Sequence, residues 1–302
     1  MTLNIIKIAF IFCACTTGFL GLLVNFFEKY LPASFSKIFR YGKFAANVKD
    51  AVLDKWEVPK RWFKHYYAFA GPFSTIAIVM VYYRYFLGGK HADGVHLGLS
   101  FLLGKPIRSL VPDENVILAM TIFAIHCWKR FYESHFVSIY SDQYMNFSLY
   151  LVGLFHYFGT IISIVGESQN FLKGTEINLN WSRLSMLDWA CALIFLVSTY
   201  LQYRSNIILS NLRKNKKGVV ITKKHKVPYG GLFNYISAPL QLTEIILYLC
   251  LSAILRSAST FHFVTLWVVI NQMECAYLSH EWSLRTFENY PKSRKIIIPY
   301  VF

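Results

Sequence analysis

Long apolar segments dominate this sequence and restrict its fold more than any other feature. A helix that crosses a bilayer needs about 20 predominantly apolar residues. Seven segments approach or exceed that length: 5–27, 66–87, 116–128, 144–165, 186–203, 239–255 and 261–279. Because lipid cannot satisfy backbone polar groups, such segments must form helices. The sequence therefore predicts an all-α polytopic membrane protein with about seven transmembrane helices in a single membrane domain, residues 1–302.

The first and third segments need separate interpretation. Segment 5–27 is interrupted only by Lys7 and Asn25 and lacks a small-x-small cleavage pattern, which favours a retained span over a removed signal peptide. Segment 116–128 reaches only 13 residues before Lys129 and Arg130. It either continues through residues 131–140 with its charges facing the protein interior or lies in the membrane interface.

The distribution of Lys and Arg predicts the orientation. The chain has 31 Lys and Arg against 16 Asp and Glu. With a lumenal N-terminus, 23 of the 31 fall in four cytosolic stretches and six in the opposite loops. The four stretches are 28–65, 129–143, 204–237 and 280–302. This positive-inside bias predicts a lumenal N-terminus and a cytosolic C-terminus, and it explains the basic charge without a nucleic-acid partner.

Composition and motifs exclude several other classes. A chain that is 55% hydrophobic and 16% charged is neither disordered nor a disulfide mini-protein. The six cysteines lie in apolar stretches without zinc-ligand spacing, so we expect buried thiols and no metal. Neither G-x-G-x-x-G nor a P-loop is present, so helices and loops would have to hold any nucleotide.

Ionisable residues inside apolar segments are candidates for function because burying them is costly. Glu244 follows the start of the sixth segment, and His126, Arg130 and Glu133 are spaced so that they share one helix face. Most of these positions lie toward the predicted cytosolic ends, which predicts a site that opens to the cytosol. A simpler alternative for Arg130 and Glu133 is an ordinary ion pair at a helix end.

A strongly basic run occupies residues 213–226, with the sequence RKNKKGVVITKKHK. It holds seven Lys and Arg and no acidic residue. Such a run can bind anionic lipid headgroups or a phosphorylated ligand, or it can be a solvated loop.

Three blocks in the C-terminal third are more specific. They are NLRKNKKGVV (211–220), HKVPYGGLFNYISAP (225–239) with Glu244 five residues on, and LSHEWSLRTFENYPKSRKIIIPYVF (278–302). Together they resemble the steroid 5-alpha-reductase family. The earlier blocks RYGK (40–43), VPKRWFKHYY (58–67) and KRFYESHFVSIYS (129–141) resemble its polyprenol reductase branch.

The resemblance implies a seven-helix NADPH-dependent reductase of the endoplasmic reticulum membrane. Its substrate would be a polyisoprenoid lipid taken from the bilayer, and NADPH would enter from the cytosol. The reaction would saturate the alpha-isoprene double bond of polyprenol-type lipids on the way to dolichol, the lipid carrier for protein N-glycosylation. Residues 186–302 would form the cofactor-binding region.

The same resemblance implies cofactor-binding residues by position. They are Tyr41, which matches a family Tyr-Gly pair with Gly42, together with Asn206, Arg213, Lys214, Glu244 and His280. Arg and Lys would supply charge-assisted hydrogen bonds to the cofactor phosphates.

The chain departs from the family pattern in two places. Leu240 and Gln241 stand where the family usually has Asn followed by an aromatic residue, which removes an amide expected near the cofactor. Steroid-acting members carry a Gln-Glu pair where this chain has Tyr67 and Ala68, and a Tyr where it has Cys127. The second departure removes the groups that would polarise a steroid ketone and so disfavours a steroid substrate.

Chemistry predicts the form of the substrate. Hydride addition to a carbon-carbon double bond needs a group that accepts negative charge, which an aldehyde offers and an allylic alcohol does not. We therefore expect polyprenal rather than polyprenol to be reduced, with a donor aimed at the aldehyde oxygen. The candidate catalytic residues are His126, Tyr67 and Glu133.

Three other functions remain open at this stage. One is a reductase of another enone or enoyl lipid, such as a 3-oxo-4-ene steroid. Another is a transport or lipid-handling membrane protein, which can also combine several spans with buried charges. The last is an inactive relative that lost cofactor binding through the change at Leu240.

Overall fold

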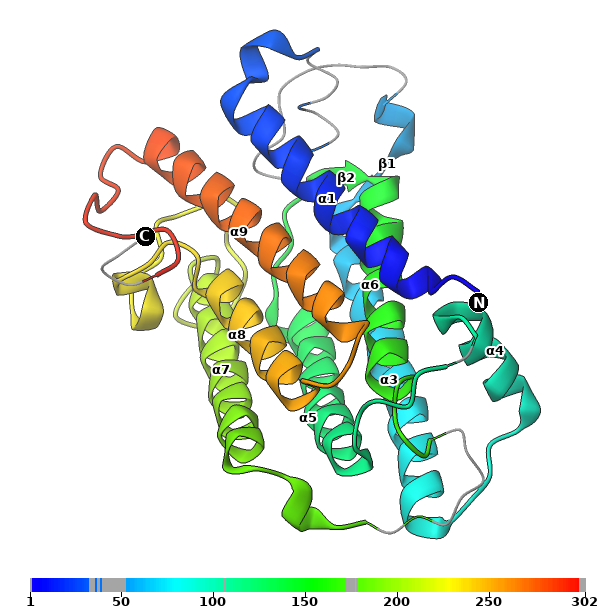
Figure 1. Cartoon of the computed structure of the whole chain (residues 1–302). Coiled ribbons are helices and arrows are strands. Elements are labelled where there is room, and N and C mark those ends of the chain that lie inside the picture. Colours follow the sequence, from blue (N-terminus) through cyan, green and yellow to red (C-terminus); the bar gives the residue numbers. More distant parts are fainter. Residues whose placement is uncertain are drawn as a thin grey trace.

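Long antiparallel helices form the body of the protein (Figure 1). The structure is a computed structural model that describes residues 2–32, 36, 39, 53–105, 107–171, 177 and 179–298. Its long helices are α1 (Ile5–Phe26), α3 (Phe63–Leu87), α5 (Asp113–Tyr132), α6 (Phe147–Val165), α7 (Met186–Asn211), α8 (Pro239–Ile254) and α9 (Phe261–Thr286). A shorter helix, α4 (Asp93–Leu103), lies beside α1.

Successive long helices run in opposite directions, so their ends gather at two ends of the molecule (Figure 1). The upper end of Figure 1 holds the C-terminal ends of α1, α5, α7 and α9 and the N-terminal ends of α3, α6 and α8. The closest helix pairs are α7 with α8, α3 with α5, and α1 with α9. Contacts of α8 with α9 and of α5 with α7 join these pairs into one bundle, and α6 packs against α3, α5 and α9.

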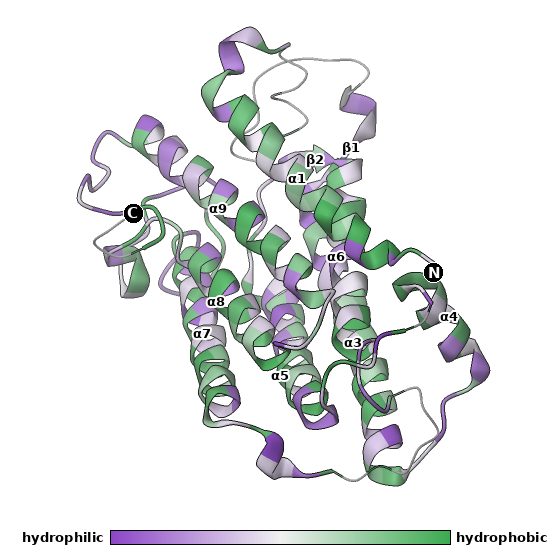
Figure 2. Cartoon of the chain, in the orientation of Figure 1, coloured by the Kyte–Doolittle hydropathy of each residue, from purple (hydrophilic) through white to green (hydrophobic). Residues whose placement is uncertain are grey.

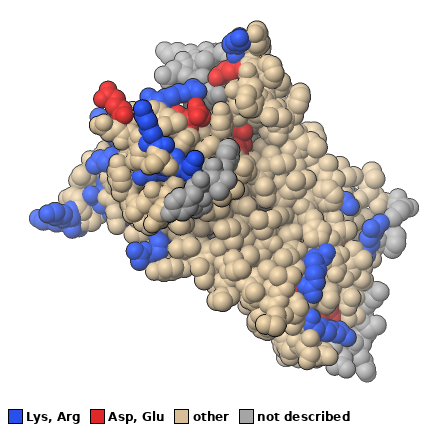
Figure 3. Space-filling view, turned by 60° about the vertical axis from the view of Figure 1, so that its left-hand side comes forward, with Lys and Arg blue, Asp and Glu red and all other residues tan. Residues whose placement is uncertain are grey.

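The helices support a polytopic membrane protein. By length and composition, four described helices could each cross a bilayer: α1, Lys60–Leu87 (which contains α3), α6 and α7. The apolar α8 is shorter, and α5 and α9 carry more polar residues. Figure 2 shows apolar residues along these helices, and Figure 3 shows charged side chains near the two ends with a broad uncharged band between them.

The helix α5 follows the first of the two alternatives for segment 116–128, since the chain stays helical to Val137 with its charged side chains facing the protein interior. It begins at Asp113 and ends at Tyr132, and Glu133–Val137 then forms one π-helical turn. Acidic residues in its first turn and basic residues in its last turn complement the helix dipole, so the helix extends beyond the apolar run at both ends. Glu133 is the first residue of the π-helical turn, which is a type of distortion frequent at functional sites.

Short elements complete the upper end. Strand β1 (Glu57–Pro59) pairs antiparallel with β2 (Tyr144–Asn146), with Val58 opposite Met145. Residues 144–146 therefore belong to a strand rather than to the predicted helix. The described 3-10 turns at this end are Glu28–Tyr30, Leu53–Trp56, Lys60–Trp62 and Gly231–Asn234, and Trp181–Arg183 lies at the lower end, before α7 (Figure 1).

Buried carboxylates organise the lower end of the bundle. Asp113 is almost fully buried at the start of α5. Its Oδ1 accepts hydrogen bonds from the hydroxyls of Tyr85 (3.0 Å) and Ser168 (2.9 Å) and from the Asn170 backbone. Its Oδ2 accepts from the Asn170 amide at 2.6 Å. These bonds fix the loop after α6 against α3 and α5.

Two further carboxylates are satisfied in the same way. Glu167 accepts hydrogen bonds from the backbone and hydroxyl groups of both Ser259 and Thr260, at the turn between α8 and α9. Asp188 completes the capping box of α7 and pairs with Arg256 at 2.5 Å. The lower end is thus closed by side chains from the α6–α7 and α8–α9 connections and from the ends of α3, α5 and α7.

Candidate active site

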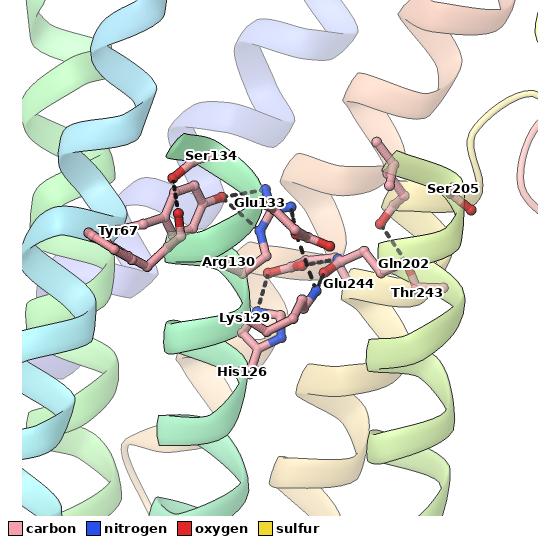
Figure 4. Close-up of polar contacts among 12 residues, drawn as sticks. Tyr67, His126, Lys129, Arg130, Glu133, Ser134, Gln202, Ser205, Thr243 and Glu244 are labelled. Atoms are coloured by element: carbon pink, nitrogen blue, oxygen red, sulfur yellow. Dashed lines mark hydrogen bonds and ion pairs between the residues drawn. The ribbon is translucent and has the colours of Figure 1, made fainter. Parts of the chain in front are cut away.

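Seven polar residues from four helices and the π-helical turn meet near the upper end of the bundle (Figure 4). This polar cluster consists of Tyr67, His126, Lys129, Arg130, Glu133, Gln202 and Glu244. It contains all three predicted catalytic residues and one predicted cofactor residue, Glu244. Along the sequence these residues lie in four separate segments, and the packing of α3, α5, α7 and α8 brings them together.

Arg130 holds one side of the polar cluster. Its Nη1 donates to Glu133 Oε2 at 2.6 Å, while its Nε and Nη2 donate to the Tyr67 hydroxyl oxygen at 3.1 and 2.5 Å. Its guanidinium carbon also lies 4.6 Å from the centre of the Tyr67 ring. Arg130 and Glu133 are thus more than an ion pair at a helix end. Because Tyr67 accepts both bonds, its own hydroxyl hydrogen is available to a ligand.

Gln202 connects the two carboxylates of the cluster. Lys129 lies 3.4 Å from Glu133 Oε2 and donates a hydrogen bond to Gln202 Oε1. Gln202 Nε2 in turn donates to Glu244 Oε2 at 2.6 Å. Gln202 was not predicted, although an amide inside the apolar segment 186–203 was a signal that could have identified it.

His126 stands out because its ring nitrogens have no hydrogen-bond partner among the described residues. The side chain is 1% exposed, and its Nε2 lies 4.0 Å from Glu244 Oε1. Glu133 Oε1 is likewise buried without a hydrogen-bond partner. Buried polar atoms are rarely left unpaired, since each loses its bonds to water without replacement. These atoms are therefore available to a ligand.

A cavity of about 420 Å³ opens beside the polar cluster at the upper end. It lies between the end of α7, the start of α8, the end of α9 and the loops that join them. Four basic residues and no acidic residue are among the described residues that line it: Lys60, Arg213, Lys224 and Lys226. Its size and charge suit an elongated, phosphorylated ligand.

Tyr140 links the cavity to the polar cluster. It lines the cavity and interacts electrostatically with Tyr67, Arg130 and Glu133. Burial raises the pKa of Tyr140, so its hydroxyl stays protonated at neutral pH. The π-helical turn Glu133–Val137 joins the two sites. It begins in the polar cluster at Glu133, and Ser138, the residue after its end, lines the cavity.

Two predicted cofactor residues line the cavity. Asn206 projects from α7 with its amide nitrogen buried and without a hydrogen-bond partner among the described residues. Arg213 donates to the backbone oxygen of Ile139. Partial burial lowers the pKa of Arg213, but a guanidinium remains charged at neutral pH because its ordinary pKa is above about 12.

The other predicted cofactor residues lie elsewhere. His280 Nδ1 is 2.7 Å from the hydroxyl of Ser237, which lines the cavity, so His280 stands one residue behind the wall. Lys214 is not among the lining residues and forms a β-bridge with Val220. Tyr41 and Gly42 lie outside the described residues.

The unusual pair Leu240 and Gln241 also lines the cavity. The departure from the family pattern therefore falls on the wall of the candidate cofactor site rather than on a remote surface. Both residues lie in the first turn of α8, which begins at Pro239.

Arg294 is a residue that sequence reasoning missed, although it lies inside the C-terminal block. It is 3% exposed, and its guanidinium carbon lies 5.2 Å from the ring of Tyr229 and 5.1 Å from that of Tyr290. Its Nε and Nη1 have no hydrogen-bond partner among the described residues. Since Tyr290 lines the cavity, Arg294 is a further cation next to the candidate cofactor site.

Metal ligation finds no support in this region. No group of three or more His, Cys, Asp or Glu residues that could hold a metal ion occurs in the part of the chain that the structure describes. The cationic cavity and the partly unpaired polar cluster instead resemble a site for an anionic cofactor beside a polar reaction centre.

Comparisons with known proteins establish the family. Residues 171–302 match the family model described as 3-oxo-5-alpha-steroid 4-dehydrogenase. The chain is 34% identical over 305 residues to the polyprenal reductase of Drosophila melanogaster, covering 99% of this chain and 94% of that protein. It is 34% identical to the Caenorhabditis elegans polyprenal reductase (86% and 85% covered) and 30% identical to the Homo sapiens one (89% and 86%).

The chain therefore belongs to the steroid 5-alpha-reductase family. Within that family it belongs to the polyprenal reductase branch, as the earlier blocks of the sequence predicted.

Proposed function

We propose that this protein is an NADPH-dependent reductase that saturates the alpha-isoprene double bond of polyprenal. The product would lead to dolichol for protein N-glycosylation, and the enzyme would act in the endoplasmic reticulum membrane. The relatives named polyprenal reductase, which match this chain over most of its length, support this substrate. The single structural observation that carries the proposal is a polar cluster with unpaired buried atoms beside a cationic cavity.

The proposed topology has seven spans with the upper end in the cytosol. The alternating directions of the seven long helices and the basic residues at the upper end support it. The shorter α8 and the more polar α5 and α9 would then cross the bilayer inside the bundle, where neighbouring helices partner their polar side chains. The cavity would open to the cytosol, where NADPH is available, while the polyisoprenoid tail stays in the lipid.

NADPH fits the cavity by charge and size. Arg213, Lys224 and Lys226 would bind its phosphate groups, and Arg294 would add a guanidinium held between two aromatic rings. Asn206 offers an unpaired amide. When bound, NADPH supplies the hydride that is added to the substrate.

Tyr67 is the donor best placed to stabilise the reacting aldehyde. Negative charge develops on the aldehyde oxygen as the conjugated double bond is reduced, and a preorganised donor stabilises that charge. Two donated bonds from Arg130 orient the Tyr67 oxygen and leave its hydrogen free. His126 can supply a second N–H because neither ring nitrogen is hydrogen-bonded within the part of the chain that the structure describes.

Glu133 and Glu244 take positioning roles in this proposal. Arg130 and Lys129 both contact Glu133 Oε2, at 2.6 and 3.4 Å. Glu133 thus holds Arg130 against Tyr67. Glu244, bonded to Gln202 and close to His126, orients the imidazole beside the cofactor cavity.

The test is an assay of the purified protein with NADPH and, separately, polyprenal, polyprenol and a 3-oxo-4-ene steroid, with mass spectrometry of the products. We expect saturation of the alpha-isoprene of polyprenal alone. Reduction of polyprenol or the steroid, with polyprenal left unchanged, would overturn the proposed substrate. If no substrate reacts and NADPH gives no protection against thermal aggregation, the protein is an inactive relative.

A further inference from the structure

The loop after α7 is an ordered hairpin rather than an extended basic tail. We call residues 213–223 the basic hairpin. Lys214 and Val220 form an antiparallel bridge, and the Ile221 amide donates to the Arg213 carbonyl at 2.9 Å. The Asn215 side chain closes the turn by accepting hydrogen bonds from the amides of residues 217 and 219, both at 3.0 Å.

Glycine makes the tight turn of this hairpin possible. Gly218 adopts a φ of 79°, in the left-handed region that other residues rarely occupy. A solvated loop does not need so many internal bonds. The hairpin therefore presents its side chains in a fixed arrangement.

The apolar side chains of the hairpin face outward. Val219, Val220 and Ile221 are 57%, 47% and 59% exposed. Lys216 and Lys217, which precede them, are exposed as well. Three consecutive exposed branched apolar residues beside two lysines are unfavourable in water, and they indicate a surface that another phase or molecule covers.

The position of the hairpin favours a bilayer as that phase. The hairpin begins two residues after Asn211, where α7, a helix long and apolar enough to cross a membrane, ends. It is therefore near the level of the lipid headgroups at the upper end. Figure 3 shows Lys and Arg on both sides of the uncharged band, and one group of them gathers at the upper end. Lysines next to a span are attracted by anionic headgroups, and apolar side chains enter the acyl boundary.

We propose that the basic hairpin is a membrane-surface anchor that recognises anionic lipid. Val219, Val220 and Ile221 enter the interface, and Lys216 and Lys217 contact the negatively charged headgroups. This site lies outside the polar cluster and does not depend on the substrate proposed above.

The membrane anchor would also hold in place the residues at the opening of the cavity. Arg213 at the first end of the hairpin and Lys224 just after its last residue both line the cavity. Lys223 is tied to Asp142 at 2.6 Å, on the loop that follows the π-helical turn. Holding the hairpin on the membrane therefore fixes two of the cations that face the cavity.

The experiment places the photo-crosslinking residue p-benzoylphenylalanine at Val220 in the full-length protein. The protein is reconstituted in nanodiscs of phosphatidylcholine with or without phosphatidylserine, irradiated, and analysed for lipid adducts by mass spectrometry. The double substitution Lys216→Gln/Lys217→Gln tests the charge. Lys90→Gln/Lys105→Gln is the matched control, since it removes two exposed lysines from other loops. Thermal aggregation of every variant verifies that it is folded.

We expect lipid adducts at residue 220, with phosphatidylserine adducts enriched over its share of the bilayer. The double substitution should abolish that enrichment, because each lysine near an anionic surface contributes about 1 kcal/mol, or about fivefold in binding. The control pair should leave it unchanged. The proposal would be overturned if no lipid adducts formed in either bilayer or if residue 220 crosslinked only to a copurified protein. It would also be overturned if the enrichment of phosphatidylserine were the same with and without the two lysines.

Discussion

The two ends of the bundle bury carboxylates in opposite ways. At the lower end, both oxygens of Asp113, Glu167 and Asp188 accept hydrogen bonds. In the polar cluster near the upper end, one buried oxygen of Glu133 has no hydrogen-bond partner among the described residues. Both ring nitrogens of His126 also lack a partner there. Among the described residues of the lower end, Glu114 is an exception, because its Oε2 also has no hydrogen-bond partner there.

This difference separates polar groups that stabilise the fold from polar groups that are available to bind a ligand. A fully bonded carboxylate has recovered what it lost on leaving water, whereas an unpaired buried atom has not. Natural proteins retain such a cost mainly where another molecule supplies the missing bond. Substitutions at the lower end should therefore affect stability, and substitutions in the polar cluster should affect activity.

The largest effect should come from Tyr67→Phe, which removes the proposed donor to the aldehyde oxygen. We expect kcat to fall about 10²- to 10³-fold, the usual loss for one such donor, with a modest fall in Tm because two Arg130 donors lose their acceptor. The neighbouring Tyr66→Phe is the matched control, since the Tyr66 hydroxyl donates to the sulfur of Met145, at 3.8 Å, and does not belong to the polar cluster. Equal loss of activity in both variants would contradict the role of Tyr67.

Glu167→Gln should have the next largest effect, and on stability. The amide would turn an NH₂ group toward donors on Ser259 and Thr260, which should destabilise the protein by about 2 kcal/mol. Thermal unfolding measures the loss, and the specific activity of the folded fraction should stay at the parent value. Glu281→Gln, at a partly exposed ion pair with Arg285, is the control and should be nearly neutral.

Arg213→Ala tests whether the cationic cavity next to the polar cluster binds the phosphate groups of NADPH. Loss of a charge-assisted bond to phosphate should raise the KM for NADPH about tenfold or more, with a much smaller change in the KM for polyprenal. Arg204→Ala removes the same charge from an exposed position on α7 and should change neither value. Parallel increases in both KM values for Arg213→Ala would argue against phosphate binding.

Gln202→Met tests whether the link between the two carboxylates matters. Glu244 would lose its bond from Gln202, and Lys129 would lose its acceptor. Since Gln202 acts through Glu244 and His126, we expect kcat to fall about tenfold, while the KM for polyprenal stays near the parent value. Gln272→Met on α9 serves as the control. A pure drop in Tm with normal kcat would show that Gln202 belongs with the structural groups instead.

Leu240→Asn should produce the smallest effect. It restores the amide that the family usually carries on the cavity wall. One added hydrogen bond of about 1 kcal/mol would lower the KM for NADPH by about fivefold. Leu242→Asn, which introduces the same amide at a residue outside the cavity lining, is the control. An unchanged KM for Leu240→Asn would show that this position does not touch the cofactor.

Much of the helical fold could be predicted from the sequence because apolar length is a local property. The seven predicted segments all fall on long helices, although four of these helices meet the length and composition expected of a membrane span. Boundaries were less predictable. The charged ends of α5 extend it beyond its apolar run, and residues 144–146 pair with a strand far away in the sequence.

The candidate site was predicted in part. Buried charge in apolar segments identified His126, Glu133 and Glu244, and the family resemblance supplied Asn206 and Arg213. Gln202, Tyr140 and Arg294 were missed, because an amide, a tyrosine or a C-terminal arginine is unremarkable until its burial and partners are known. Tyr41 remains a prediction because it lies outside the described residues.

The sequence by itself determined the membrane class, the helical segments and the family, since hydropathy, charge and local motifs can be read along one chain. Tertiary structure alone decided that Tyr67 meets Arg130 and that Gln202 joins Lys129 to Glu244. Those contacts connect residues on different helices. Helix packing, which depends on the shapes of all the side chains between them, sets their distances and decides which buried atoms remain unpaired.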